Sequence, residues 1–198
     1  PSGDACQRCE LSDDGSTLYV TSTDRGYKNM WLTAVDVNTG AERILAHEKG
    51  KTYVEMGHGT RLDPASWYVF QDDDVLWWSQ RDGWAHLYML GADGEVRTQL
   101  TSGAWMVERV LHVDEASGQI YFIARGREAE RFIYEAYMYR INRDGSGLTL
   151  MTPEEGHHEI TWSPDGSTFV DRWSQIDVPA QIALKSRADG RTIMPLEA

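Results

Sequence analysis

The chain alternates between short turns rich in Asp and Gly and short apolar stretches. One kind of turn comes directly before an apolar stretch, and its copies are SDDG (12–15), QDDD (71–74), DEASG (114–118) and SPDG (163–166). The stretches that follow them are STLYVTS, VLWWSQ, QIYFIAR and STFVDRW. A second kind of turn follows a stretch of alternating polarity, at VNTG (37–40), ADG (92–94), RDGSG (143–147) and ADG (188–190). Because Asp and Gly accept positive φ in tight turns, this pattern predicts strands joined by hairpins.

The two kinds of turn alternate, and each recurs after roughly 45 to 60 residues. Each copy therefore predicts a four-stranded antiparallel meander, which is typical of a β-propeller blade. We expect an all-β fold with about four blades, at approximately residues 1–50, 51–102, 103–155 and 156–198. The four apolar stretches should be buried inner strands. Gly94, Gly145 and Gly166 should have positive φ.

The connection between the second and third strands is longer in one copy. It lies in REAERFIYEAYMYR (127–140), whereas RGYKN, RDGWA and QIDVPA are the shorter equivalents. Any helix should be confined to this insertion, around residues 128–137. A loop that grows in one repeat often lies on a functional or interface face, and a harmless surface insertion is the alternative.

Four blades are at the low end of the four to eight that close a propeller. An unclosed array exposes a strand edge and two blade faces, which favours aggregation. We therefore expect a segment of a larger propeller and not a closed ring.

Composition supports a β fold and narrows the partners. The 198 residues include 8 Trp and 9 Tyr, which favour strands. The net charge of −12 argues against nucleic acid, because phosphate binding requires clustered Lys and Arg. No run of 18 apolar residues is present, so we expect no membrane segment. The chain begins at Pro1 without Met, which leaves room for an upstream leader or region.

Three motifs resemble a known family in order and spacing. They are S-x-RDGW-x-HLY, QLTSG-x-W-x-V and H-x-x-x-SPDG-x-x-FVD-x-x-S-x-x-D-x-P, within a similarity that runs from about Leu11 to Met194. Together they resemble the N-terminal propeller region of dipeptidyl peptidase IV-like serine exopeptidases, in the prolyl oligopeptidase superfamily. The resemblance implies the second half of an eight-bladed propeller that ends just before an α/β-hydrolase domain.

The catalytic residues of such a hydrolase are missing from this chain. Its nucleophile lies in Gly-x-Ser-x-Gly, where small neighbours expose the serine on a sharp turn. No serine here has that frame, and DGSG (144–147) is a hairpin turn. The catalytic domain is therefore expected outside this chain, which should hydrolyse nothing by itself.

Several polar residues are candidates for a site. The pair Glu154 and Glu155 resembles the glutamates with which the family holds a substrate's amino terminus, but its place in MTPEEG predicts a solvated turn. His157-His158 and His86 suggest metal binding, but no carboxylate or third His lies at ligand spacing from them. We therefore expect pairing across a blade or solvation of these histidines, and no metal. No cofactor is expected.

The tryptophans and cysteines have structural and functional alternatives. Recurrence at equivalent strand positions predicts packing between blades, and not a ligand-stacking surface, for Trp77, Trp78, Trp84, Trp105, Trp162 and Trp173. Cys6 and Cys9 form a lone C-x-x-C, for which a redox or metal role competes with two ordinary cysteines or a disulfide.

The resemblance also implies one substrate contact. The family places a propeller-loop arginine against the substrate backbone, and GHGTRLDPASW offers Arg61 in about that region, although its neighbours depart from the family pattern. An ordinary surface arginine is the alternative.

The leading hypothesis is the non-catalytic propeller portion of an exopeptidase acting on short X-Pro peptides. This portion would cap the hydrolase domain and gate substrate access. The resemblance implies a periplasmic or secreted protein, and a cytoplasmic location is the alternative, because the family also has cytoplasmic members. A stand-alone interaction propeller, closed by dimerisation, is the alternative. A complete small enzyme is the weakest hypothesis.

Overall fold

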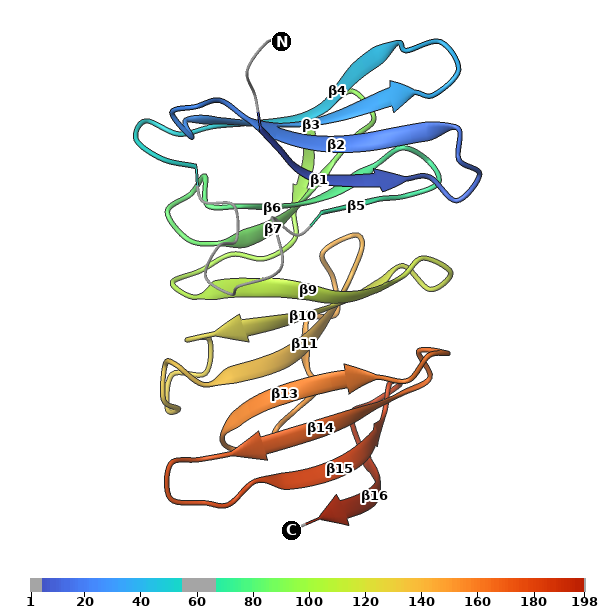
Figure 1. Ribbon diagram of the computed structural model, residues 1–198. Coiled ribbons are helices and arrows are strands. Elements are labelled where there is room, and N and C mark those ends of the chain that lie inside the picture. Colours follow the sequence, from blue (N-terminus) through green and yellow to red (C-terminus); the bar gives the residue numbers. More distant parts are fainter. Residues whose placement is uncertain (1–4, 55–66, 198) are drawn as a thin grey trace. The chain divides into compact units, whose positions relative to one another are not determined.

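The computed structural model describes residues 5–54 and 67–197, and their side chains over 8–54 and 67–196. The chain forms two compact units, Pro1–Ser102 and Gly103–Ala198. Each unit contains two four-stranded sheets, and every pair of neighbouring strands is antiparallel (Figure 1). The described residues include no helix, and hence none that could cross a membrane.

The first unit contains two meanders. The first has the strand order β1-β2-β3-β4, and the second has the order β5-β6-β7-β8. Their bounds are β1 Ala5–Leu11, β2 Thr17–Thr23, β3 Asn29–Asp36, β4 Glu42–Lys49, β5 Trp67–Val69, β6 Val75–Ser79, β7 His86–Leu90 and β8 Val96–Gln99.

The second unit repeats this arrangement. Its sheets have the strand orders β9-β10-β11-β12 and β13-β14-β15-β16. Their bounds are β9 Met106–Asp114, β10 Gln119–Arg125, β11 Ala136–Asn142, β12 Thr149–Leu150, β13 His157–Trp162, β14 Thr168–Ser174, β15 Gln181–Ser186 and β16 Thr192–Glu197. The predicted fold class, an all-β propeller segment of four-stranded antiparallel sheets, is confirmed.

The four predicted inner strands are second in their sheets, but they are not equally buried. All of β6 and most of β10 are buried. In β2 and β14 only alternate residues are buried, as in strands with one face on a core. The expectation of well-buried strands is therefore correct for β6 and β10 and too strong for β2 and β14.

The cores lie between neighbouring sheets of each unit. In the first unit, Met30 and Leu32 of β3 join Trp77 of β6 in one apolar cluster. In the second unit, Tyr121 of β10 and Phe169 of β14 belong to another. Large aromatic side chains thus supply much of the apolar area that holds adjacent sheets together.

Side-chain carboxylates and glycines shape the hairpin turns. Gly94, Gly145 and Gly166 have φ of 80°, 86° and 65°, which confirms the predicted positive values. Asp14 Oδ1 accepts a hydrogen bond from the Ser12 hydroxyl at 2.7 Å and from a backbone N–H at 2.9 Å. These bonds lower the pKa of Asp14 to about 2.

The long connection at 126–135 contains turns and no helix, in keeping with the expectation that helix is absent from the rest of the chain. Two backbone bonds join residues three apart, from Arg131 N–H to Glu128 O and from Glu135 N–H to Phe132 O, both at 3.0 Å. Arg131 also donates to the Pro153 carbonyl at 2.7 Å. The connection must return the chain to pair with β10, and these tertiary contacts override its local helical preference.

Candidate functional site

A group of buried charged side chains lies on β13, β14 and β15 of the fourth sheet. Strand pairing places Ile160 opposite Asp171, and Asp171 opposite Ala183. Side chains two positions along a neighbouring strand share a face and are within reach of long side chains. His158 and Lys185 occupy these diagonal positions, so strand register brings both to Asp171.

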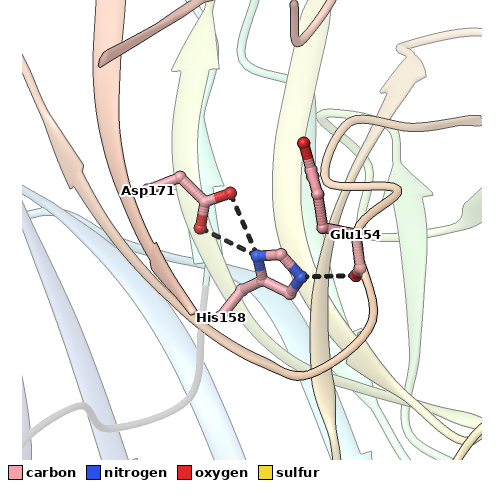
Figure 2. A group of neighbouring side chains, drawn as sticks. All are labelled: Glu154, His158 and Asp171. Carbon is pink, nitrogen blue, oxygen red and sulfur yellow. Dashed lines mark hydrogen bonds and ion pairs between the residues drawn. The ribbon is translucent and has the colours of Figure 1, made fainter. Parts of the chain in front are cut away.

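The charged groups contact one another directly. His158 Nδ1 lies 2.8 and 3.0 Å from the two Asp171 carboxylate oxygens, and Lys185 Nζ lies 2.9 Å from Asp171 Oδ2. Glu154, in the connection before β13, places Oε2 2.5 Å from Lys185 Nζ. The backbone carbonyl of Glu154 lies 2.9 Å from His158 Nε2, and Figure 2 shows this contact beside the bonds between His158 and Asp171. The side chains of His158, Asp171 and Lys185 are fully buried, and that of Glu154 is 33% exposed. We call these four residues the ionic cluster.

The buried polar groups of the ionic cluster face one another. The two ring nitrogens of His158 face the Asp171 carboxylate and the Glu154 carbonyl, and the Lys185 ammonium faces both carboxylates. Burial of the Lys185 and Asp171 charges is tolerated because each has a partner of opposite sign within hydrogen-bond distance.

Aromatic rings surround the ionic cluster. Lys185 Nζ lies 4.9 Å from the centre of the Trp173 ring, and the His158 ring lies 5.3 Å from that of Tyr137. Tyr137 belongs to β11 of the third sheet, and its hydroxyl accepts a hydrogen bond from Gly156 N–H at 3.2 Å. Burial raises the pKa of Tyr137. The connection between the third and fourth sheets therefore bonds to both of them, through Gly156 to Tyr137 of the third sheet and through Glu154 to Lys185 of the fourth.

The ionic cluster contains the donor types of a metal site. The ligand atoms of Glu154, His158 and Asp171 lie within 4.8 Å of one another, and no second such group occurs among the described residues. However, the Lys185 ammonium contacts both carboxylates, at 2.5 and 2.9 Å. It takes the place of a bound cation, so the arrangement is an internal ion-pair network.

The structure corrects one expectation and extends another. Glu155 is exposed as predicted, but Glu154 belongs to the ionic cluster and is not simply solvated. His158 is paired within its own sheet, and His86 is buried with Nδ1 3.0 Å from the Thr101 hydroxyl, in line with the prediction of pairing. Half-buried His157 has its pKa lowered by burial and by the nearby charge of Arg125.

Sequence reasoning missed Lys185 and a repeated threonine. A lysine at an inward position of AQIALKS, two residues after buried Ala183, was the available signal. The second signal was the Thr that ends LT at 100–101 and MT at 151–152. The Thr101 hydroxyl accepts a hydrogen bond from Leu87 N–H and the Thr152 hydroxyl accepts one from Met138 N–H, both at 2.9 Å.

The tryptophans follow the packing prediction in part, and Trp173 stacks on His158 of its own sheet, with ring centres 6.0 Å apart. Trp77, Trp78 and Trp105 are buried, and Trp162 packs edge-on against Tyr121 at 5.0 Å between ring centres. Trp84 is 45% exposed in the connection between β6 and β7, so the prediction of packing is wrong there.

Two earlier candidates remain open. Arg61 lies outside the described residues, so its substrate role stays a prediction. Cys9 is exposed on β1, and the side chain of Cys6 is also outside the described part.

Comparison with known proteins identifies relatives that are much longer than this chain. Dipeptidyl peptidase 4 of Arthroderma otae is 29% identical over 178 residues, which are 86% of this chain and 22% of that protein. Probable dipeptidyl-aminopeptidase B of Aspergillus clavatus is 27% identical over 187 residues, 90% of this chain and 20% of that protein. The chain thus spans about a fifth of the length of these curated relatives.

Solved structures show the same fold. The crystal structure of Porphyromonas gingivalis dipeptidyl peptidase 4 matches all of this chain with a TM-score of 0.83 and 18% identity, over 26% of its own length. A putative dipeptidyl aminopeptidase IV from Bacteroides ovatus matches 99% of this chain with a TM-score of 0.75 and 22% identity, over 29% of its length. The family model for the dipeptidyl peptidase IV N-terminal region matches residues 5–180, and the chain therefore belongs to this family.

Proposed function

We propose that the chain is the non-catalytic propeller portion of a dipeptidyl peptidase IV-like serine exopeptidase. The observation that carries the proposal is the family match over residues 5–180, combined with the lack of a Gly-x-Ser-x-Gly motif in the sequence. The four sheets form blades at approximately 1–50, 51–102, 103–155 and 156–198, in the second half of an eight-bladed propeller. An α/β-hydrolase domain elsewhere in the parent protein supplies the nucleophile, base and oxyanion hole.

In this role the propeller caps the hydrolase domain and restricts access to short X-Pro peptides. The ionic cluster serves as a rigid element of the cap, because Glu154 ties the connection at 151–156 to the fully buried Lys185 ammonium of the fourth sheet. Arg61 contacts the substrate backbone. The parent protein works in the periplasm or outside the cell.

Two probes test the proposal. The 198-residue chain should leave an X-Pro-nitroanilide uncleaved, and a fluorophosphonate should label none of its serines. The longer natural polypeptide should cleave the substrate and be labelled once, in its hydrolase domain. Labelling of a serine within this chain would contradict the proposal, as would a natural reading frame that lacks a hydrolase domain.

The competing function is a stand-alone interaction propeller closed by dimerisation. Native mass measurement separates it from the proposal, because two four-bladed halves would form a tight dimer of this chain.

Replacing Arg61 with Ala in the longer enzyme should raise KM or lower kcat for dipeptide release, and unchanged kinetics would leave it a surface arginine.

A further inference from the structure

A small basic surface lies on the first sheet of a chain whose net charge is −12. It forms where the β2–β3 connection meets the end of β4 and the segment that follows it. Its exposed side chains are those of Arg25, Tyr27, Lys28, Lys49, Lys51 and Tyr53. We call these six residues the basic patch.

Backbone hydrogen bonds join the two segments of the basic patch. Gly50 N–H donates to the Lys28 carbonyl at 2.9 Å, and Val54 N–H donates to the Tyr27 carbonyl at 2.7 Å. Strand pairing also places Lys49 opposite the residue that follows Lys28. Side chains that are distant in sequence therefore form one continuous surface within the first unit.

The cations of the basic patch are available to an outside anion. Among the described residues, no carboxylate forms an ion pair with any of the four. Asp24, which lies beside them, accepts a hydrogen bond from Lys28 N–H at 2.8 Å and so caps its own turn. Glu48 pairs with Arg81 at 2.7 Å and accepts from the Ser79 hydroxyl at 2.8 Å. Lys and Arg without such partners form strong charge-assisted hydrogen bonds with carboxylates.

Two tyrosine rings belong to the same surface. Tyr27 and Tyr53 are 40% and 49% exposed, with ring centres 5.9 Å apart and an angle of 39° between the ring planes. Tyr27 has φ of 50°, a conformation that bulky residues rarely adopt. Its N–H donates to the Asp24 carbonyl at 3.0 Å, and this bond and the one from Val54 hold the strained backbone. Strain of this kind gathers at ligand-binding sites.

The charge of the whole chain selects among anionic ligands. A chain of net charge −12 repels a long polyanion such as nucleic acid and a negatively charged membrane. Attraction is therefore confined to a ligand short enough to lie within the basic patch. Exposed tyrosine rings add affinity for Pro and aromatic side chains, which pack on ring faces. A peptide segment that carries Asp or Glu beside Pro or an aromatic residue combines both features.

We propose that the basic patch binds acidic segments of peptides. The Lys and Arg side chains pair with the carboxylates, and the two tyrosine rings contact the Pro or aromatic side chains of the ligand. This inference goes beyond the proposed function, because it concerns binding and not cleavage. In a peptidase, a second contact of this kind raises the effective concentration of acidic peptides at the protein.

Fluorescence anisotropy tests the inference on the natural polypeptide that contains this chain. The probe is the peptide Glu-Glu-Pro-Tyr-Glu-Glu with fluorescein on its amino terminus, so that an exopeptidase cannot release a dipeptide from it. The matched probe has Lys in place of Glu. The acidic probe should bind at least tenfold more tightly than the basic probe, although the whole chain is negative. Its dissociation constant should rise at least fivefold between about 50 and 300 mM NaCl, because salt screens exposed charges. Equal affinity of the two probes would overturn the inference.

Two double variants locate the binding site. Lys28→Gln/Lys49→Gln should weaken binding of the acidic probe at least fivefold. Arg97→Gln/Arg191→Gln removes the same charge from side chains that are 57% and 75% exposed elsewhere, and it should change the dissociation constant less than twofold. Equal losses in the two variants would indicate general electrostatic attraction and would overturn the inference.

Tyr27→Asn separates binding from folding. Asn adopts positive φ more readily than Tyr, so the melting temperature should not fall. Loss of the ring should nevertheless weaken binding of the acidic probe at least threefold, and an unchanged affinity would contradict its role. A thymidine oligonucleotide of equal charge that binds as tightly as the acidic probe would assign the basic patch to anions in general and overturn the peptide assignment. Each readout is binding, so failure here leaves the proposed function to its own cleavage and labelling tests.

Discussion

Replacing Lys185 with Met tests whether the ionic cluster stabilises the fourth sheet. Methionine keeps much of the apolar stem but removes the ammonium, which lies 2.9 Å from Asp171 and 2.5 Å from Glu154. Asp171 is fully buried, so it would keep a charge with one partner fewer. Removing one member of a buried ion pair costs about 3–5 kcal/mol of unfolding free energy.

A matched control lies on the same strands. Arg172 and Glu159 form an ion pair of 2.9 Å on β14 and β13, but their side chains are 48% and 59% exposed. Exposed pairs contribute about 0–1 kcal/mol, because water screens them. Arg172→Met should therefore lower the unfolding free energy by less than about 1 kcal/mol, although the interatomic distance is almost the same.

Urea unfolding, followed by tryptophan fluorescence and circular dichroism, measures both changes. With a slope of about 2–3 kcal/mol per molar urea, Lys185→Met should lower the midpoint of the second unit by roughly 1–2 M. A Lys185→Met/Asp171→Asn double variant should be less destabilised than the sum of the two single variants, because the amide removes the stranded charge. Equal midpoints for Lys185→Met and Arg172→Met would refute the reasoning.

Three more predictions follow from the turns and connections. Gly156 has φ of +133°, and a Cβ there would lie 2.7 Å from a backbone carbonyl oxygen. Gly126 has φ of +74°, but the space around it is open. Gly156→Ala should therefore lower the free energy of unfolding by more than Gly126→Ala does. Gly126→Ala should lower the free energy of unfolding by about 1 kcal/mol, measured by chemical unfolding. Equal losses for the two variants would contradict the close approach of a Cβ at position 156 to the carbonyl oxygen. Gly94→Val should lower the melting temperature, because φ is +80° and a Cβ would lie 3.0 Å from a carbonyl oxygen; an unchanged value would contradict the turn. Turn hydrogen bonds lower the pKa of Asp14 and Asp165 from 3.8 to about 2, so their contribution to stability is present above pH 4 and is lost as the pH falls toward 2. The Asp14→Asn/Asp165→Asn variant should lose less stability than the parent chain between pH 4 and 2, and equal urea midpoints across that range would contradict this.

Local sequence was sufficient for the repeat and its turns. The positive φ at Gly94 follows from the Ala-Asp-Gly sequence, because the turn needs a residue without Cβ penalty and a carboxylate that caps the backbone. The order of the four strands in each sheet follows from the short connections, which force neighbours in sequence to pair. Family membership could likewise be recognised from motifs, since those motifs are short and contiguous.

Only the tertiary structure decided which charges are buried in the ionic cluster and which apolar side chains of the β10–β11 and β14–β15 connections are exposed. Lys185 and Glu154 are 31 residues apart, and each looks like an ordinary solvated charge in its local sequence. Whether such a charge is buried depends on strand register, because a shift by one residue turns every side chain to the other face. The connection at 126–135 has a pattern compatible with helix, yet its ends must meet across the β10–β11 pair. Arg125 at the end of β10 donates to the Tyr134 carbonyl, and Arg131 within the connection donates to the Pro153 carbonyl. Periodicity and turn chemistry act over a few residues and therefore determine the blades, whereas pairing between distant residues decides which polar groups are buried and which apolar groups face outward.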